Sequence, residues 1–487
     1  MDAFADSKFR KNFLSVLFIY VLVYKFADGL TIQTHGDPQY YHLAGAKIFL
    51  THGLKVLAHD LQGYAQAGLF DALYVIPLLF TKNLLAVQLI AQEMHLAFSL
   101  FLGAFLFRRW IPNRTLGILG AISLMTISRD FAFFIYAKND GVVALTTLIA
   151  AYWIYKRKPA ALIGLGLGLI PSIKMSGLIC SFSLALIYCF QNRKNFKAIL
   201  VAGGVSILTL LPMMVKNFYF TANPVFPVLL KLIPGTVSVY TQSLYLHYFS
   251  EAPTISSIVQ NFQDLFLGKL VYWIGIILAC IKIKKRQWDG MEFFISALLI
   301  FSIYTFSHGV YQGARFFFSV YFLLLFFTFL ELSKYSLKAK WYWPLVLLIL
   351  VDSNVDFVGA KIYQNVKELA THTEEELLQK HIIQMKLVNA MERHPTVETF
   401  IYSDYRLESF YLDPHYRLIN FGQSRDSGFF QNCKTQDDVA QISQFRYFWL
   451  HTDLENECYR AIKNQSKLVA RVELDGAYEA IYERISY

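Results

Sequence analysis

Charged residues are scarce in this sequence, and their scarcity excludes an ordinary soluble protein. Lys, Arg, Asp and Glu make up 16% of the 487 residues, whereas soluble globular domains contain roughly 25%. Hydrophobic residues reach 55%, including 43 phenylalanines, which is more apolar surface than a soluble core of this length requires. The composition therefore predicts a polytopic α-helical membrane protein.

Cysteine is rare as well, and its pattern excludes two further classes of protein. The chain has five cysteines and no C-x-x-C pair, so the spacing indicates neither a disulfide framework nor a zinc site. Cys180, Cys189 and Cys280 fall in apolar runs, where a cysteine acts as a small core residue. Cys433 and Cys458 lie in the polar C-terminal part, and whether they form a disulfide stays open.

Nucleotide-binding motifs, solenoid repeats and low-complexity tracts are also absent from the sequence. The glycine-rich stretch GLGLGLIPSIK (164–174) alternates glycine within an apolar run and does not follow a strand. The net charge of +10 comes from short basic clusters between apolar runs. That pattern is typical of membrane topology rather than of a nucleic-acid interface, so we expect no nucleic-acid partner.

Apolar segments predict about eleven transmembrane helices within a membrane domain of residues 1–351. Several are shorter than the ~20 residues that a crossing helix normally needs. The first follows a basic tail without an A-x-A-like cleavage site, which predicts an uncleaved helix. The segments are 13–30, 84–107, 115–127, 141–155, 160–173, 175–190, 198–215, 266–281, 291–306, 316–332 and 341–351.

The distribution of basic residues predicts the orientation of these helices. If the N-terminus is cytoplasmic, the inner loops carry nineteen Lys and Arg and the outer loops carry nine. This excess follows the positive-inside rule at every inner loop. After eleven crossings the C-terminus is extracytoplasmic, and the longer outer loops are 31–83 and 216–265.

The composition changes at about Asp352, and residues 352–487 are predicted to form an extracytoplasmic soluble α/β domain. Residues 373–394 have the pattern of one amphipathic helix. Strands are expected at 397–404, 416–421, 445–450, 466–474 and 477–485, and the Asp475-Gly476 step predicts a hairpin turn between the last two.

Ionisable residues at the ends of apolar segments concentrate on the predicted outer face. Asp37 follows the first segment, Asp140 precedes the fourth, Lys174 lies between the fifth and sixth, and Arg315 precedes the tenth. Charges at membrane depth are costly and usually mark a site or a pathway. Two carboxylates and two cations there indicate an anionic ligand and an acid–base step.

Structural roles are the alternative for each of these residues. Asp37 before Pro38 suits the start of a helix, and Asp140 lies where a helix would be capped. Lys174 and Arg315 could place their charges at the interface without binding anything.

A metal site is a weaker interpretation of the first outer loop. His35, Asp37 and His42 are close in sequence, but their spacing matches no strong ligand pattern, and we predict no metal ligands. No cofactor is predicted, although a divalent cation at Asp140 stays open.

The order of motifs resembles that of the GT-C glycosyltransferases, in the bacterial branch related to protein O-mannosyltransferases and lipid A aminoarabinose transferases. The matching stretches are GDPQYYHLAGAKIF (36–49), YAKNDGVVALTTLIAAYWIYKRK (136–158), GLGLGLIPSIKMSGLI (164–179), TANPVFP (221–227) and GARFFF (313–318). They cover the membrane part in the family's order. The chain departs from the family at YAQAGLFDALYVIPLLF (64–80), which lacks the paired prolines, and at Ala222, where relatives have glycine.

The resemblance implies transfer of a sugar from a polyprenyl-phosphate donor to a glycan, lipid or protein acceptor on the extracytoplasmic face, with inversion at the anomeric carbon. Asp37 would be the general base, Asp140 would orient the acceptor, share the base role or hold a divalent cation, and Arg315 and Lys174 would bind the donor phosphate. Residues expected in the substrate loops are Tyr40, Tyr41, His42, Asn223 and His308. A multi-pass protein of the bacterial inner membrane is implied.

Two other functions are compatible with part of the sequence. A flippase or transporter of a lipid-linked sugar would explain many helices, but the sequence has no inverted repeat. An O-antigen ligase or polymerase normally has its large loop late in the chain, and here it is in the middle. Within that loop, residues 253–266 have helical spacing and could form either a lid over the site or an interfacial helix.

Overall fold

The structure is a computed structural model, and it describes most of the helical part and much of the C-terminal part. The described residues are 7–32, 42–52, 68–126, 139–230, 232–233, 235, 253–266, 270–307, 317–335, 341–353, 358–382, 385–393, 399–403, 416–420, 446–451, 457–474 and 477–485.

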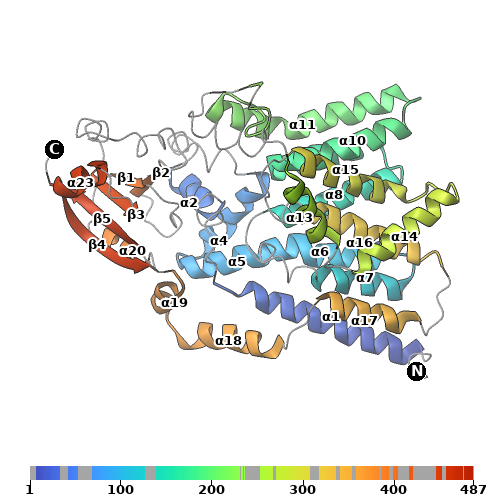
Figure 1. Cartoon of the computed structure of the whole chain (residues 1–487), viewed down its shortest axis with the longest axis horizontal. Coiled ribbons are helices and arrows are strands. Elements are labelled where there is room, and N and C mark those ends of the chain that lie inside the picture. The colour runs from blue at the N-terminus through green and yellow to red at the C-terminus, as the bar shows by residue number, and fades with distance from the viewer. Residues whose placement is uncertain are drawn as a thin grey trace. The chain divides into compact units, whose positions relative to one another are not determined.

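Each predicted apolar segment is largely helical in the residues that the structure describes. The helices are α1 (Ser7–Gly29), α5 (Leu84–Leu96) with η5 (Ala97–Phe101) and α6 (Leu102–Trp110), α7 (Arg114–Thr126), α8 (Asp140–Tyr155), α9 (Ala160–Ile173), α10 (Leu178–Gln191), α11 (Phe196–Thr221), α14 (Leu270–Lys284), α15 (Met291–Ser307), α16 (Phe318–Leu332) and α17 (Tyr342–Ser353) (Figure 1). In the described part, Lys11–Gly29, Leu84–Trp110 and Phe196–Thr221 are long and apolar enough to cross a membrane, and seven shorter apolar helices accompany them. The number of crossings stays a prediction.

By its contacts the chain divides into two compact units. Unit 1 contains 1–31, 91–212 and 247–367, and unit 2 contains 32–90, 213–246 and 368–487. These ranges do not follow the predicted division at residue 352, because parts of the long loops join the C-terminal residues in unit 2. The boundary between a membrane domain and a soluble domain stays a prediction.

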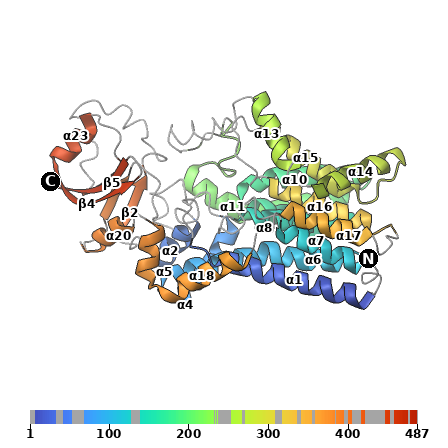
Figure 2. The same ribbon diagram turned by 60° about the horizontal axis from the view of Figure 1, so that its bottom comes forward.

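Helix α16 is the core of unit 1. Every residue from Phe318 to Glu331 is buried, as expected of a helix that is apolar on all sides. It packs against α7, α8, α14 and α15 (Figures 1 and 2). The Phe326 ring lies 4.8 to 6.1 Å from the rings of Phe293, Phe107, Tyr152 and Trp110, and aromatic pairs at this spacing are favourable.

The glycine-rich stretch serves helix packing. A Cβ atom at Gly164 would clash with the carbonyl oxygen of Ala202, and one at Gly168 would lie 2.5 Å from the carbonyl oxygen of Ser206. Helices α9 and α11 approach closely because these two positions, four residues apart, carry no side chain. This is the small-residue interface typical of membrane helices, and it explains the motif without a nucleotide.

The predicted inner loops meet at one end of unit 1. Contacts that join them pairwise are Phe13–Trp343, Asn113–Tyr342, Trp110–Tyr152, Tyr155–Phe293, Gln191–Glu292 and Asp289–Lys334. The basic clusters of the sequence therefore share one end of the helical bundle, and we call it the basic end.

Helix α13 (Ile255–Phe266) confirms the helical spacing within residues 253–266, with the helix beginning at Ile255. Its apolar residues Ile255, Val259 and Phe262 are exposed, while Ser257 and Asn261 are buried. An apolar face turned outward is typical of a helix in contact with lipid, and a role as a lid stays a prediction.

The C-terminal residues contain a mixed five-stranded sheet, and all five predicted strands are present. They are β1 (Thr399–Ser403), β2 (Tyr416–Asn420), β3 (Tyr447–His451), β4 (Ser466–Leu474) and β5 (Ala477–Arg484), in the order β2-β1-β3-β5-β4 (Figure 1). Strand β1 pairs in parallel with β2 and β3, and β5 pairs antiparallel with β3 and β4. Helix α23 (Glu457–Asn464) packs on β4 and β5. The predicted Asp475-Gly476 turn lies outside the described residues.

The prediction of one helix over 373–394 was wrong. The segment forms α19 (Glu374–His381) and α20 (Met385–Glu392), and Ile382 between them is extended and buried. Burial of this side chain outweighs the helical pattern of the segment. The preceding helix α18 (Val358–Thr371) was not predicted.

A charge cluster holds α19 against the end of α18. Lys380 Nζ and His381 Nε2 lie 2.8 and 2.9 Å from the two carboxylate oxygens of Glu368. These hydrogen bonds lower the pKa of Glu368 to about 2. A carboxyl group with a depressed folded-state pKa stabilises the fold above its unfolded pKa, and this contribution is lost as the pH falls through the folded pKa.

We therefore expect Glu368→Gln to lower the unfolding temperature at neutral pH. The difference from wild type should shrink once the pH falls below about 4.5 and vanish near about pH 2. Thermal unfolding of both proteins across this range measures it. A difference that stays constant with pH would show that ionisation of Glu368 contributes nothing.

Candidate functional site

Asp140 and Lys174, both predicted as site residues, form a buried ion pair. Asp140 is the first residue of α8, and Lys174 lies between α9 and η8 (Met175–Gly177). Lys174 Nζ donates to Asp140 Oδ1 over 2.8 Å, and the side chains are 12% and 6% exposed. The ammonium group therefore binds a carboxylate and does not extend freely to an interface, which disfavours the snorkelling alternative.

Helix α15 supports this pair from its C-terminal end. The Tyr304 hydroxyl donates to the carbonyl oxygen of Ser176 over 2.7 Å, and Gly177 N–H donates to the carbonyl oxygen of Lys174 over 2.8 Å. Both bonds fix the backbone beside the ammonium group. The pair belongs to unit 1 and lies at the helix ends opposite the basic end, since α8 begins here and ends at Tyr155.

Asn139, rather than Asp140, occupies the N-cap of α8. Its backbone φ of 63° lies in the left-handed helical region, and its side chain makes no capping hydrogen bond. Asp140 lies in the first turn, where the helix dipole favours a negative charge. The carboxylate is thus directed to Lys174 and is not a conventional cap.

Unit 2 contains a second buried charge cluster, formed by His42, Asp71 and Lys216. His42 Nδ1 lies 2.6 Å from Asp71 Oδ1, and both side chains are almost completely buried. Lys216, near the C-terminal end of α11, is half-buried and interacts electrostatically with Asp71. The cluster brings together an imidazole, a carboxylate and an ammonium group from three separate segments.

Asp71 also organises the backbone around this cluster. Its Oδ2 accepts a hydrogen bond of 2.5 Å from Gly68 N–H, which caps η4 (Leu69–Tyr74). Helix α4 (Val75–Phe80) continues from η4, and α2 (Leu43–His52) follows His42. Sequence reasoning missed Asp71 and gave no role to Lys216. The signal was GLFD, in which an acid three residues after a helix-initiating glycine resembles a capping box.

Removing the Asp71 carboxylate should show how much its interactions with His42 and Gly68 contribute to stability. We expect Asp71→Ala to lower the free energy of unfolding by about 1–3 kcal/mol, because it leaves the Gly68 amide and His42 without their acceptor. A double-mutant cycle with His42→Ala, followed by thermal unfolding, measures the pair. Additive effects of the two changes would contradict a direct His42–Asp71 bond.

Asn223 holds the TANPVFP loop together. It is fully buried. Its Nδ2 donates to the carbonyl oxygens of Val228 and Ile233 over 3.2 and 2.9 Å, and its Oδ1 accepts from Val225 N–H over 2.9 Å. The predicted substrate-loop residue thus uses its amide within the loop, and any contact with substrate would come through the backbone it fixes.

Ala222 has a conformation that favours glycine, the residue of the family pattern. Its φ is 54°, and a Cβ in the left-handed region costs about 1–2 kcal/mol. We expect Ala222→Gly to raise the free energy of unfolding by up to about 1 kcal/mol, because part of this gain is offset by the greater backbone entropy of glycine in the unfolded chain. Thermal unfolding measures it, and a lower unfolding temperature would contradict a strained Ala222.

Several predicted site residues lie outside the described residues: Asp37, Tyr40, Tyr41, His308, Arg315 and, among the metal candidates, His35. Their roles stay predictions. Within the described part, no group of three or more His, Cys, Asp or Glu residues could hold a metal ion. Cys433 and Cys458 are also undetermined, because Cys433 is outside this part and the Cys458 side chain is not described.

The chain was compared with known proteins. No family model matches it, and no curated protein matches it. Two crystal structures of ArnT from Cupriavidus metallidurans are similar, one bound to undecaprenyl phosphate and one in the apo state. Both give a TM-score of 0.63 at 12% sequence identity. The alignments cover 97% of this chain and 98% of the bound ArnT, and 96% and 97% for the apo form.

The similarity covers nearly the full length of both chains. The chain therefore has the fold of these ArnT structures, which agrees with the fold that the order of its motifs implies.

Proposed function

We propose that the protein is an integral-membrane glycosyltransferase that moves a sugar from a polyprenyl-phosphate donor to an acceptor. The observation that carries the proposal is the shared fold over 97% of the chain with an ArnT structure bound to undecaprenyl phosphate. A donor with a long isoprenoid tail requires access from lipid, and the exposed apolar surface of α11, with Leu208 and Val215, is of the kind that faces lipid.

The reaction needs a base and a cation. In the proposed mechanism the Asp37 carboxylate accepts the proton of the acceptor hydroxyl while its oxygen attacks the anomeric carbon. The bond to the phosphate oxygen breaks, the lipid phosphate leaves, and the anomeric centre inverts. Arg315 binds the phosphate with two parallel hydrogen bonds, and this positive charge stabilises the leaving oxygen as negative charge develops.

The two buried clusters suggest further roles. Lys174 is already paired with Asp140, so it would stabilise phosphate charge while keeping that carboxylate in place. Lys216 beside Asp71 is a second cation for an anionic substrate. Asp140 would orient the acceptor or hold a divalent cation.

The distribution of basic residues supports one orientation of the protein in the membrane. The basic end of the bundle would face the cytoplasm by the positive-inside rule, and the Asp140–Lys174 pair, at the opposite helix ends, would then be extracytoplasmic. The acceptor is a glycan, lipid or protein on that face, and the bacterial inner membrane is the proposed location.

Release of the lipid product tests this function. Purified protein in lipid nanodiscs is supplied with polyprenyl-phosphate sugars and a membrane extract as the source of acceptor. The proposal predicts free polyprenyl phosphate and a sugar-modified acceptor in equal amounts. Release of lipid phosphate without a modified acceptor would indicate a hydrolase and contradict the proposal.

A further inference from the structure

An apolar groove opens at the basic end, between α10 and α15. Its volume is about 470 Å³, within the range of small-molecule sites. Residues that form its walls include Leu186, Ile187 and Phe190 from α10 and Ile295 and Leu299 from α15, with Trp288 in the loop before α15. All of them belong to unit 1.

Two aromatic residues of the groove are exposed. Phe190 is 71% exposed and Trp288 is 60% exposed. Large aromatic side chains at the end of a membrane helix are typical of the interface between lipid tails and headgroups. The apolar walls of the groove are suited to a lipid acyl chain. Phe190 and Trp288 indicate the level in the membrane at which the headgroup of that lipid would lie.

Six exposed cations lie close in sequence to the two aromatic residues of the groove. Arg193, Lys194 and Lys197 follow Phe190 in the chain, and Lys284, Lys285 and Arg286 precede Trp288. The Arg193 guanidinium carbon lies 5.2 Å from the centroid of the Phe190 ring, so this cation is held at the groove wall by a cation–π contact.

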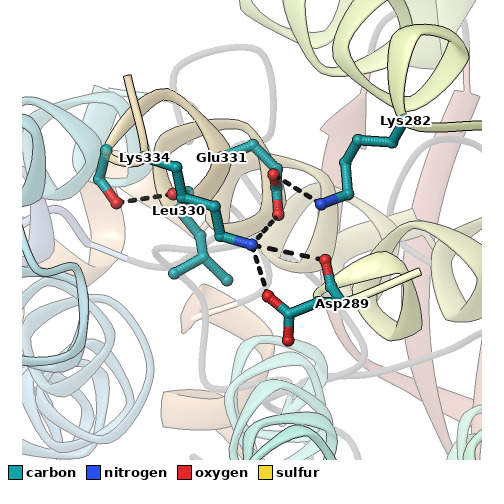
Figure 3. Close-up of polar contacts among 6 residues, drawn as sticks. Lys282, Asp289, Leu330, Glu331 and Lys334 are labelled. Atoms are coloured by element: carbon teal, nitrogen blue, oxygen red, sulfur yellow. Dashed lines mark hydrogen bonds and ion pairs between the residues drawn. The ribbon is translucent and has the colours of Figure 1, made fainter. Parts of the chain in front are cut away.

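The neighbouring carboxylates already have partners. Asp289 accepts from Lys334 over 2.7 Å, and Glu331 accepts from Lys334 and from Lys282 over 2.8 and 2.9 Å (Figure 3). Glu292, which also lines the groove, accepts from Gln191 Nε2 over 2.8 Å with one oxygen, and its other oxygen is buried without a hydrogen bond in the described part of the chain. The ion network of Figure 3 neutralises the charges of Lys282 and Lys334, so the positive charge near the groove comes from the six exposed cations, which outnumber the single carboxylate of Glu292.

We propose that this groove binds an anionic glycerophospholipid of the inner leaflet, with one acyl chain between α10 and α15 and the phosphate at Arg193 and Arg286. Basic pockets between membrane helices on the cytoplasmic side bind anionic headgroups in this way. The groove lies at the end of the helices opposite the Asp140–Lys174 pair, so the lipid is a separate ligand and not the sugar donor.

Native mass spectrometry of the full chain, titrated with phosphatidylglycerol or phosphatidylcholine, tests the proposal. Wild type should retain phosphatidylglycerol preferentially. The double variant Arg193→Ala/Arg286→Ala should lose affinity for it by about tenfold or more. Ile295→Trp fills the groove without changing charge and should weaken binding as well.

The control is Arg157→Ala/Lys158→Ala, in another basic loop of the same end. Arg157 and Arg286 both have left-handed backbones, with φ of 50° and 57°, so the two substitutions carry the same backbone cost. The control pair should bind phosphatidylglycerol as wild type does. An equal loss in the control would show diffuse surface charge and overturn the proposal.

Two further outcomes would overturn it. Equal retention of phosphatidylcholine and phosphatidylglycerol by wild type would show that no anionic headgroup is recognised. Tighter binding of undecaprenyl phosphate that depends on Arg193 and Arg286 would assign the groove to the isoprenoid lipid. Neither outcome bears on sugar transfer, because the readout is lipid retention, and the proposed enzymatic function is tested separately.

Discussion

Lys174→Met is expected to lower the free energy of unfolding by about 3–5 kcal/mol, because it leaves the Asp140 carboxylate buried without its cation. Asp140→Asn should destabilise the protein similarly, because Lys174 Nζ then loses its carboxylate partner in the same low-dielectric surroundings. The double variant should be more stable than the sum of the two changes predicts, since both charges are then gone. Thermal unfolding in detergent or nanodiscs measures all three.

The rate of sugar transfer shows whether the Asp140–Lys174 pair is only structural or also contributes to the reaction. The folded double variant should transfer sugar at least about tenfold more slowly than wild type, because it lacks a cation near the donor phosphate. Lys282→Met is the matched control: it breaks the buried Lys282–Glu331 pair of 2.9 Å at the basic end, so it should destabilise the protein without slowing transfer per folded molecule. Wild-type transfer by the double variant would reduce Asp140 and Lys174 to a structural pair.

Asp37→Asn is expected to slow sugar transfer by about 10²–10⁴-fold, because the amide cannot accept the proton of the acceptor hydroxyl. Binding of the donor should change little, since in the proposed mechanism its phosphate is held by Arg315 and Lys174 and not by Asp37. The measurement is the initial rate of product formation at saturating donor, with the folded yield of each variant checked by thermal unfolding.

A matched control distinguishes the base from a helix cap. Asp60 lies in the same predicted outer loop, 31–83, and Asp60→Asn removes the same charge without a proposed role in the reaction. It should retain the wild-type rate. Equal rates for Asp37→Asn and wild type would leave Asp37 as an N-cap only, and would require another base, for which the His42–Asp71 pair is the first candidate.

The helices were predictable because membrane helices depend on local composition. A run of apolar residues must form its backbone hydrogen bonds internally in lipid, so each predicted segment became a helix whatever its neighbours were. The bounds agree closely as well: Ala160–Ile173 was predicted and observed. The composition does not predict which helices pack against one another. The close approach of α9 to α11 at Gly164 is one example.

Two of the predicted site residues, Asp140 and Lys174, form a pair in the structure, and the sequence did not predict that pairing. Asp140 and Lys174 were both chosen, yet their bond depends on how α8 and α9 pack. Asp71 was overlooked because its environment is created by His42, 29 positions away, and because an acid near a helix start has an ordinary local explanation. Such partners follow from tertiary packing alone.

The C-terminal sheet shows the same division between local and distant information. The alternation of apolar and polar residues predicted its five strands. Strands β4 and β5 pair antiparallel, as expected for a hairpin. The pairing of β1 with β3, which places β1 between β2 and β3, joins residues more than 40 positions apart, such as Ile401 and Tyr447. The break at Ile382 was invisible because no glycine or proline marks it.

One measurement tests the proposed glycosyltransferase most directly. Wild-type protein in sealed proteoliposomes is supplied with a polyprenyl-phosphate donor that carries a radiolabelled sugar, together with a membrane extract as acceptor. We predict that label moves from the donor into a new product while polyprenyl phosphate is released. Label that crosses the bilayer still attached to its lipid, with no new product formed, would contradict a transferase and identify a transporter of the lipid-linked sugar.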